Sequence, residues 1–202
     1  FRISKILEKI TQEPEYKECY DYCSNVVFPE WPGRGSGNKR DSNGLSRSGG
    51  MEGMELRTAS SPKDVKHYTT ERLREEFLIQ GLFAADEIKL VYSHIDRIIT
   101  GTATPVGKKL ELTAGEELRA EYFLQRRELG VINIGGAGKI TIDGKVYEVA
   151  PREGMYVGMG ARDISFESVD GTNPAKFYLN SAPAHTTYPT VLIKREGTPE
   201  DG

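Results

Sequence analysis

The stretch of sequence that decides the fold is GVINIGGAGKITIDGKVYEV, residues 130–149. Apolar and polar residues alternate in GKITI and again in KVYEV, which is the period of a half-buried strand. Asp143-Gly144, between these two runs, is a strong signal for a two-residue hairpin turn. We therefore predict an antiparallel hairpin here, with a further strand, GVINI, directly before it.

Short runs of the same kind lie on both sides of the hairpin, and turn residues rather than long helices separate them. The predicted strands cover 88–94, 97–105, 108–114, 130–136, 138–149, 154–158, 163–169 and 175–180. Strands at this spacing are typical of an antiparallel sandwich or barrel and argue against a parallel α/β fold. One short helix is predicted before them, ERLREEFL at 71–78, capped by Thr69 or Thr70.

The glycine cluster IGGAG, residues 134–138, does not fit a nucleotide-binding loop. The glycines of a dinucleotide-binding fingerprint or a P-loop open a helix, whereas these glycines lead into the strand KITI. We interpret them as permitting a tight bend with positive φ between two strands.

Composition places the chain among ordinary globular proteins. It has 202 residues, 37% of them hydrophobic and 28% charged, and a formal net charge of -3. This balance excludes a generally basic nucleic-acid binder, and no run of 18 apolar residues exists to form a transmembrane helix. The two cysteines, Cys19 and Cys23, are too few for a disulfide scaffold or, without further ligands nearby, for a zinc site. They favour a cytoplasmic location.

The character of the sequence changes near residue 50. Residues 31–50 are rich in glycine and serine, which predicts a flexible linker, and MEGMELR after them reads like a translation start. We therefore expect residues 1–50 to be a leader and linker that are foreign to the domain that follows.

Two arginines, Arg126 and Arg127, stand just before the GVINI strand. A guanidinium group matches a carboxylate bidentately, so this pair suits recognition of an acidic sugar. The alternative is a solvated or subunit-interface cluster paired with Glu116, Glu117 and Glu121, and spacing alone favours that alternative.

The three histidines do not predict a metal site. His67, His94 and His185 have none of the spacings that put two ligands on one helix turn or one strand face. We expect each to be a surface or hydrogen-bonded histidine. His185 belongs to NSAPAHTTYP (180–189), a segment that is apolar and proline-rich enough to line a pocket or to cover a sheet edge.

Three long strings carry a resemblance to a known family: YSHIDRIITGTATP (92–105), YFLQRRELGVINIGGAGKITIDGKVYEV (122–149) and FYLNSAPAHTTYPT (177–190). They closely resemble the bacterial 5-keto-4-deoxyuronate isomerases of pectin and uronate breakdown. The resemblance implies two cupin-like β-barrels, a homohexamer and a cytoplasmic location. On this basis, residues 51–190 correspond to the N-terminal barrel and 191–202 begin the connection to the second barrel.

Zinc is the cofactor that the resemblance implies, bound through a His-x-His, a Glu and a later His in the C-terminal half. None of these metal ligands is expected in this chain. Tyr122 and Leu124 stand at the two histidine positions of the cupin motif, although Glu128 and Gly135 keep its later interval. In the second cupin motif, Asp163 stands at the histidine position.

The implied reaction interconverts 5-dehydro-4-deoxy-D-glucuronate and 3-deoxy-D-glycero-2,5-hexodiulosonate, which are acidic keto sugars. We therefore expect an arginine clamp for the carboxylate, formed from Arg97, Arg126 and Arg127. His94 and His185 are the candidate proton carriers. The competing hypothesis is a non-catalytic cupin module that assembles the oligomer or binds uronate. Neither a nucleic acid nor a membrane is an expected partner.

Overall fold

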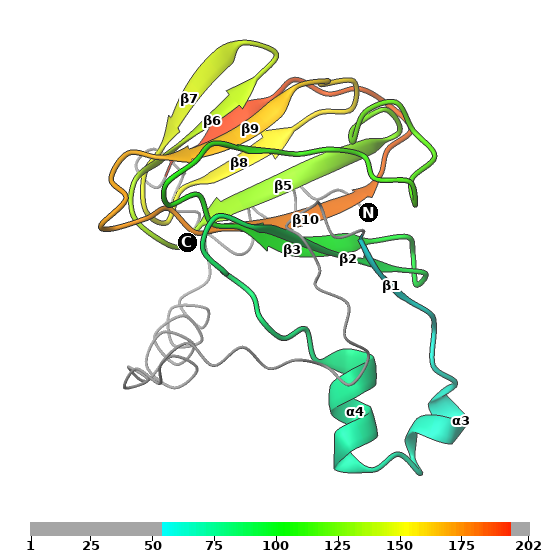
Figure 1. Ribbon diagram of the computed structural model, residues 1–202. Coiled ribbons are helices and arrows are strands. Elements are labelled where there is room, and N and C mark those ends of the chain that lie inside the picture. The colour runs from blue at the N-terminus through cyan, green and yellow to red at the C-terminus, as the bar shows by residue number, and fades with distance from the viewer. Residues whose placement is uncertain (1–53, 195–202) are drawn as a thin grey trace, which may run out of the picture.

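The computed structural model describes residues 54–194. The leader and linker predicted over 1–50, the cysteine pair and the last part of the predicted connection lie outside the described residues. The described chain forms two β-sheets that face each other, preceded by two helices (Figure 1). The predicted fold class, a mainly β antiparallel sandwich or barrel, is confirmed.

The larger sheet has seven strands in the order β1-β2-β3-β10-β5-β8-β11, and the smaller has four in the order β4-β9-β6-β7. Only β1 and β2 pair in parallel; the other described pairs are antiparallel. The larger sheet contains β1 (Glu55–Arg57), β2 (Ile88–Ser93), β3 (Ile99–Ala103), β10 (Phe177–Pro183), β5 (Arg127–Asn133), β8 (Gly154–Val157) and β11 (Val191–Ile193). The smaller sheet contains β4 (Leu110–Glu111), β9 (Ile164–Ser168), β6 (Gly138–Ile142) and β7 (Lys145–Val149).

The β6–β7 hairpin forms as predicted. Asp143 and Gly144 in its turn both have positive φ, 47° and 81°, which is the backbone twist that suits a two-residue hairpin. Oδ1 of Asp143 also accepts backbone hydrogen bonds from Arg162 and Asp163, each 2.9 Å long. The turn is thereby tied to the residues that lead into β9.

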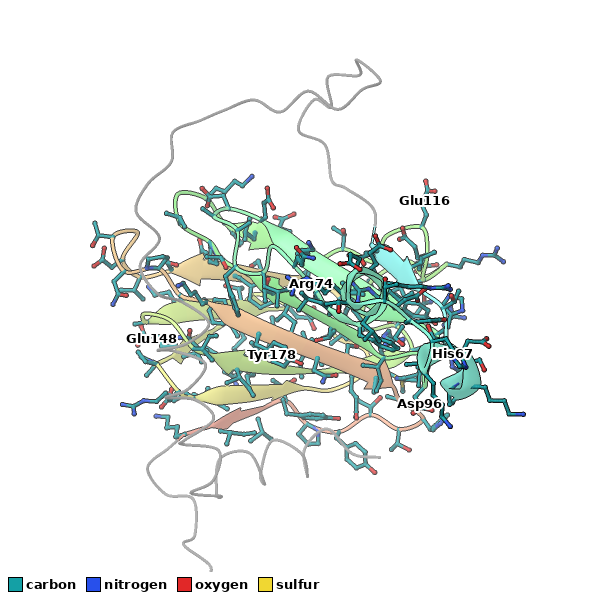
Figure 2. All side chains as sticks on the ribbon, turned by 90° about the horizontal axis from the view of Figure 1, so that it is seen from below. His67, Arg74, Asp96, Glu116, Glu148 and Tyr178 are labelled. Atoms are coloured by element: carbon teal, nitrogen blue, oxygen red, sulfur yellow. The ribbon has the colours of Figure 1, made fainter. Side chains whose placement is uncertain are left out.

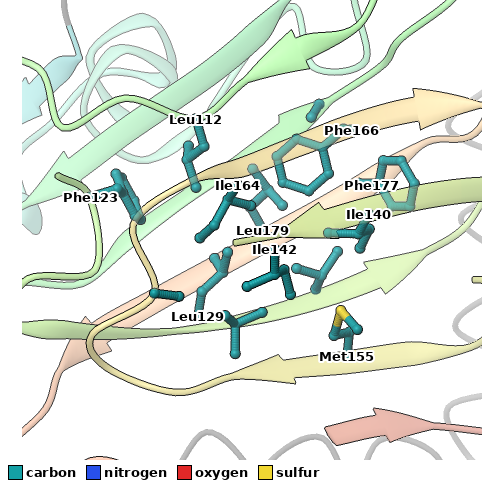
Figure 3. Packing of buried hydrophobic residues seen from close by; sticks show 14 of the residues in the cluster. Leu112, Phe123, Leu129, Ile140, Ile142, Met155, Ile164, Phe166, Phe177 and Leu179 are labelled. Carbon is teal, nitrogen blue, oxygen red and sulfur yellow. The ribbon is translucent and has the colours of Figure 1, made fainter. Parts of the chain in front are cut away.

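The hydrophobic core lies between the two sheets (Figure 3). Alternate residues of each strand point inward, so β5 contributes Leu129 and Val131, and β10 contributes Phe177 and Leu179. Phe166 of β9 meets Phe177 across the interface, with ring centroids 5.3 Å apart. Burying an apolar side chain of this size contributes roughly 2 kcal/mol, so these contacts hold the sheets together.

The reason for glycine at positions 135, 136 and 138 differs from the predicted one. Gly135, Gly136 and Gly138 do not have positive φ, so the predicted bend with positive φ is wrong. These glycines are needed for close approach of two chain segments. A Cβ atom on Gly136 would lie only 2.0 Å from the backbone oxygen of Asn173, a distance that no real Cβ contact allows.

Asn133, the last residue of β5, fixes the geometry of this bend. Its side chain is completely buried, and its Nδ2 donates to the carbonyls of Gly136 (2.7 Å) and Val149 (3.0 Å). Its Oδ1 accepts from the backbone N–H groups of Gly135 (3.1 Å) and Lys176 (3.3 Å). All four hydrogen-bonding positions of the amide are used, so the side chain is specific for asparagine.

Two helices, rather than the single one predicted, precede most of the strands: α3 (Pro62–Val65) and α4 (Thr70–Phe77). The α4 helix is the predicted one, and Oγ1 of Thr69 caps it by accepting from the N–H of Arg72. The short α3 helix has no hydrophobic period to reveal it. Both helices lie outside the sandwich, beyond the larger sheet in Figure 1, and neither contains a buried residue.

Strand β5 begins at Arg127 rather than at Gly130 as predicted. Spacing favours a solvated or subunit-interface cluster at Arg126 and Arg127, and Arg126 is indeed exposed, but Arg127 is only 6% exposed, as is Glu128. The edge strands β1 and β11 were not predicted, because three residues are too few to show a period. Val191–Ile193 pair with β8 and so extend the larger sheet past the predicted boundary at residue 190.

Candidate functional site

One end of the sandwich is hollowed where the β2–β3 turn, the loop before β5 and the end of β10 meet. The cavity has a volume of about 330 Å³. We call it the arginine cavity, and its walls are Tyr92, Arg97, Glu117, Leu118, Ala120, Phe123, Arg126, Arg127 and Pro183. Asp96 and Glu116 directly precede Arg97 and Glu117 in the sequence. Figure 2 shows them at one end of the molecule and Glu148 of β7 at the other.

Arg127 is the charged group most deeply set in this cavity. As the first residue of β5 it shares the inward face with Leu129 and Val131. Its Nε donates to Oγ of Ser181 (3.1 Å), and its Nη2 donates to the carbonyls of Ser181 (3.0 Å) and Arg97 (2.5 Å). Within residues 54–194, its Nη1 makes no hydrogen bond and its guanidinium joins no ion pair.

The surroundings of Arg127 disfavour its positive charge. Its pKa is lowered to about 10, chiefly by burial; the nearby charge of Arg97 also lowers it, while Tyr92 acts in the opposite direction. The guanidinium carbon lies 5.7 Å from the centre of the Tyr92 ring. At neutral pH Arg127 is therefore a buried cation, and burying a cation without a paired anion costs free energy.

The other two predicted arginines line the same cavity but are held differently. Arg97 lies in the β2–β3 turn with φ of 54°, and its side chain is exposed. Arg126 is exposed as well, but its Nη2 donates to the carbonyls of Leu118 (3.2 Å) and Arg119 (3.0 Å). Arg126 therefore anchors the loop before β5. The structure thus brings all three predicted arginines together, whereas within the described chain neither Arg126 nor Arg127 pairs with a glutamate.

A second cavity, of about 500 Å³, adjoins the first and shares two of its residues. Its walls are Leu56, Tyr92, His94, Glu116, Glu117 and Arg119. The ring of His94 meets the ring of Tyr92 edge-on, with centroids 5.5 Å apart and planes at 84°. Oε2 of Glu117 is buried and has no hydrogen-bond partner among the described residues. Tyr92 and Glu117 thus connect the two cavities.

The predicted histidines are not brought together. All three are exposed; His94 lines the second cavity, whereas His67 and His185 line neither cavity. The segment that contains His185 does contribute Pro183 to the arginine cavity.

The described residues do not fit a zinc ion. Nowhere between residues 54 and 194 do three His, Cys, Asp or Glu side chains gather in a way that would hold a metal. At the positions of the cupin motif, Leu124 is buried in the core, and Tyr122 packs under the guanidinium of Arg162 at 4.7 Å. The Glu128 carboxylate accepts from the hydroxyl of Tyr156 at 2.8 Å, on the outward face of the larger sheet.

Tyr92 was not predicted as a site residue, and Glu117 was named only as a partner in the alternative charge cluster. Tyr92 continues the inward series Ile88, Leu90 along β2, so strand alternation was a signal that could have found it. Glu117 lies in a loop without periodicity, and nothing in the sequence distinguishes it from its glutamate neighbours.

The model of the KduI/IolB family matches residues 77–201, well over half of the chain. The chain belongs to the KduI/IolB family. The resemblance read from its sequence is thereby confirmed, and the cupin-like description of its barrel agrees with the two-sheet architecture. Neither described helix of this KduI/IolB chain has the length and apolar character needed to cross a membrane.

Two relatives in the KduI/IolB family are named 4-deoxy-L-threo-5-hexosulose-uronate ketol-isomerase. The protein from Lachnoclostridium phytofermentans is 78% identical over 143 residues, which is 71% of this chain and 52% of the relative. The protein from Lachnospira eligens is 57% identical over 143 residues, 71% of this chain and 51% of the relative. The chain therefore spans about half the length of the curated relatives that it matches. A solved cupin protein from Bacteroides fragilis aligns with a TM-score of 0.37 and 14% identity, over 55% of this chain and 88% of that one.

Proposed function

We propose that this chain forms the N-terminal barrel of a 4-deoxy-L-threo-5-hexosulose-uronate ketol-isomerase. The protein would interconvert 5-dehydro-4-deoxy-D-glucuronate and 3-deoxy-D-glycero-2,5-hexodiulosonate during the breakdown of pectin and uronates in the bacterial cytoplasm. The observation that carries this proposal is the 78% identity over 143 residues to a relative of that name.

An aldose–ketose isomerisation moves a proton between adjacent carbons, so it needs a base and a group that stabilises charge on the carbonyl oxygen. Of the two predicted proton carriers, the geometry supports His94, because it faces a cavity next to Tyr92. We propose that the zinc of the family is bound outside residues 54–194, since the described side chains do not fit it.

The test exchanges matching parts of two proteins. The 143 matching residues of the Lachnoclostridium phytofermentans relative are replaced with those of this chain, and isomerisation of 5-dehydro-4-deoxy-D-glucuronate is measured together with bound zinc. We expect kcat/KM within about tenfold of the unmodified relative, loss of turnover with a chelator and recovery with zinc. The 202-residue chain alone is expected to show no turnover and no stoichiometric zinc.

Two results would contradict the proposal. One is a folded, zinc-loaded chimera that has no activity on the keto sugar. The other is turnover by the isolated chain with zinc bound, which would mean that ligands within this barrel had been overlooked.

The expected partner of this barrel is a further copy of the same protein, and a homohexamer is the proposed assembly. The support is an exposed apolar side of α4 and its C-cap residue: Leu73 is 38% exposed, Phe77 54% and Leu78 39%. Exposed apolar patches of this kind are typical of protein interfaces.

We expect Phe77→Ser to weaken this association, because it removes the most exposed aromatic group of the α4 surface. Sedimentation velocity over a range of protein concentrations measures the effect as a shift toward smaller species. Val146→Ser is the matched control, since Val146 is 55% exposed and lies on β7 of the smaller sheet rather than on α4. A native chain that sediments as a monomer at every concentration would exclude the assembly role.

A further inference from the structure

Among residues 54–194, the walls of the arginine cavity carry an excess of positive charge. Three arginines line it against one glutamate. The buried guanidinium of Arg127 is held by Ser181 and by the carbonyl of Arg97, but its Nη1 has no partner in the described chain. Three hydrogen bonds fix its plane, so the two N–H groups of Nη1 are already oriented. A planar guanidinium presented in this way is suited to a carboxylate.

The remaining walls are those of a small-molecule site with mixed character. Oε2 of Glu117 is buried and has no donor within the described part of the chain, and a ligand hydroxyl group would satisfy it. Tyr92, Leu118 and Phe123 supply an apolar and aromatic surface, against which the carbon face of a sugar ring packs well. The volume, about 330 Å³, is at the lower end of the range for small-molecule pockets.

We propose that the arginine cavity is a binding site for a small sugar acid. The ligand carboxylate would lie against Nη1 of Arg127 and the side chain of Arg97, and its hydroxyl groups would donate to Glu117. Arg126 would hold the loop that closes one wall, through the carbonyls of Leu118 and Arg119. The chemical class of the ligand is inferred from the residues that line the cavity, and it does not depend on the isomerase proposal.

The energetic consequence of binding follows from the same contacts. A bound carboxylate supplies the anion that Arg127 lacks and so relieves the unfavourable burial of its charge. Because Arg127 also bridges β5, β10 and the β2–β3 turn, the ligand would stabilise all three against unfolding. Any ligand that binds only the folded state raises the melting temperature.

Isothermal titration calorimetry of the 202-residue chain with D-glucuronate, in the presence of a chelator, tests the proposal without any turnover. We expect saturable binding at one site, with D-glucose and acetate each binding at least about tenfold more weakly. Arg97→Gln is expected to weaken D-glucuronate binding about tenfold, and Arg127→Met more than that. Arg74→Gln removes an exposed arginine of α4 and should leave binding unchanged.

Circular dichroism establishes whether each variant folds. Arg127→Met has the greater risk of misfolding, because it removes three hydrogen bonds. Arg97 contributes only its backbone carbonyl to the described hydrogen bonds, so Arg97→Gln should fold and still test the site. Absence of saturable binding to the native chain, or equal binding by native chain and Arg97→Gln, would overturn the site. Equal affinity for acetate or inorganic phosphate would overturn the assignment to a sugar acid. An inactive chimera with intact D-glucuronate binding would count against the isomerase proposal alone.

Discussion

We expect Asn133→Asp to lower the free energy of unfolding by roughly 3 to 5 kcal/mol, although the two side chains are nearly the same size. Asn133 is completely buried, and its Nδ2 donates to the carbonyls of Gly136 and Val149. An aspartate would place a second oxygen against these two carbonyl oxygens and bury a negative charge that two backbone N–H groups, but no described cation, would contact. Urea denaturation of both proteins at neutral pH measures the loss.

The loss should become smaller in mild acid, because a protonated aspartate regains one donor. Asn173→Asp is the matched control, since that side chain is exposed, and we expect it to change stability by no more than about 0.5 kcal/mol. An Asn133→Asp variant as stable as the native chain would show that the amide does not fix the bend after β5.

The second large effect is expected for Gly101→Ala, with a loss of about 3 kcal/mol or more. Gly101 lies in β3, opposite Leu90 of β2 and Leu179 of β10. A Cβ atom there would lie 2.0 Å from the backbone oxygen of Lys89 and 2.9 Å from Cδ2 of Leu90. The backbone oxygen can move away only if β2 separates from β3, so the substitution weakens the pairing of these two strands.

Gly107→Ala is the control for Gly101→Ala, because the same change meets only Oδ2 of Asp86 at 3.5 Å, an ordinary contact. We expect it to stay within about 0.5 kcal/mol of the native chain. Thermal unfolding followed by circular dichroism gives both values, and equal melting temperatures for the two variants would contradict the close-packing argument.

The strands were largely predictable because their signals are local. Alternation along KITI and KVYEV and the Asp143-Gly144 turn determine the hairpin without any help from the rest of the fold. Edge strands such as Val191–Ile193 are different: three residues carry no period, and they become a strand only because β8 offers them an edge. The same holds for the close approach at Gly136, which depends on Asn173 and cannot be read from neighbouring residues.

For the candidate site, the sequence indicated residue types but not their environment. Arg126 and Arg127 are adjacent and chemically identical, yet one is exposed and anchors a loop while the other is buried beside Ser181. Strand alternation separates such neighbours, but only once the start of β5 is known. The place of Glu117 in the cavity wall was beyond prediction, because it depends on how the loop before β5 folds over the cavity.

The strand order of the larger sheet has a consequence for how the chain is made on the ribosome. β10 lies between β3 and β5, and the Thr100–Tyr178 hydrogen bond joins residues 78 positions apart. Pairing over such a separation is slow compared with closing the β6–β7 hairpin. In a nascent chain, the edges of β3 and β5 that face β10 therefore stay unpaired until residue 183 has emerged. Insertion of β10 between them then joins the two parts of the larger sheet. During that interval the growing chain is most open to chaperones and to mispairing with its neighbours.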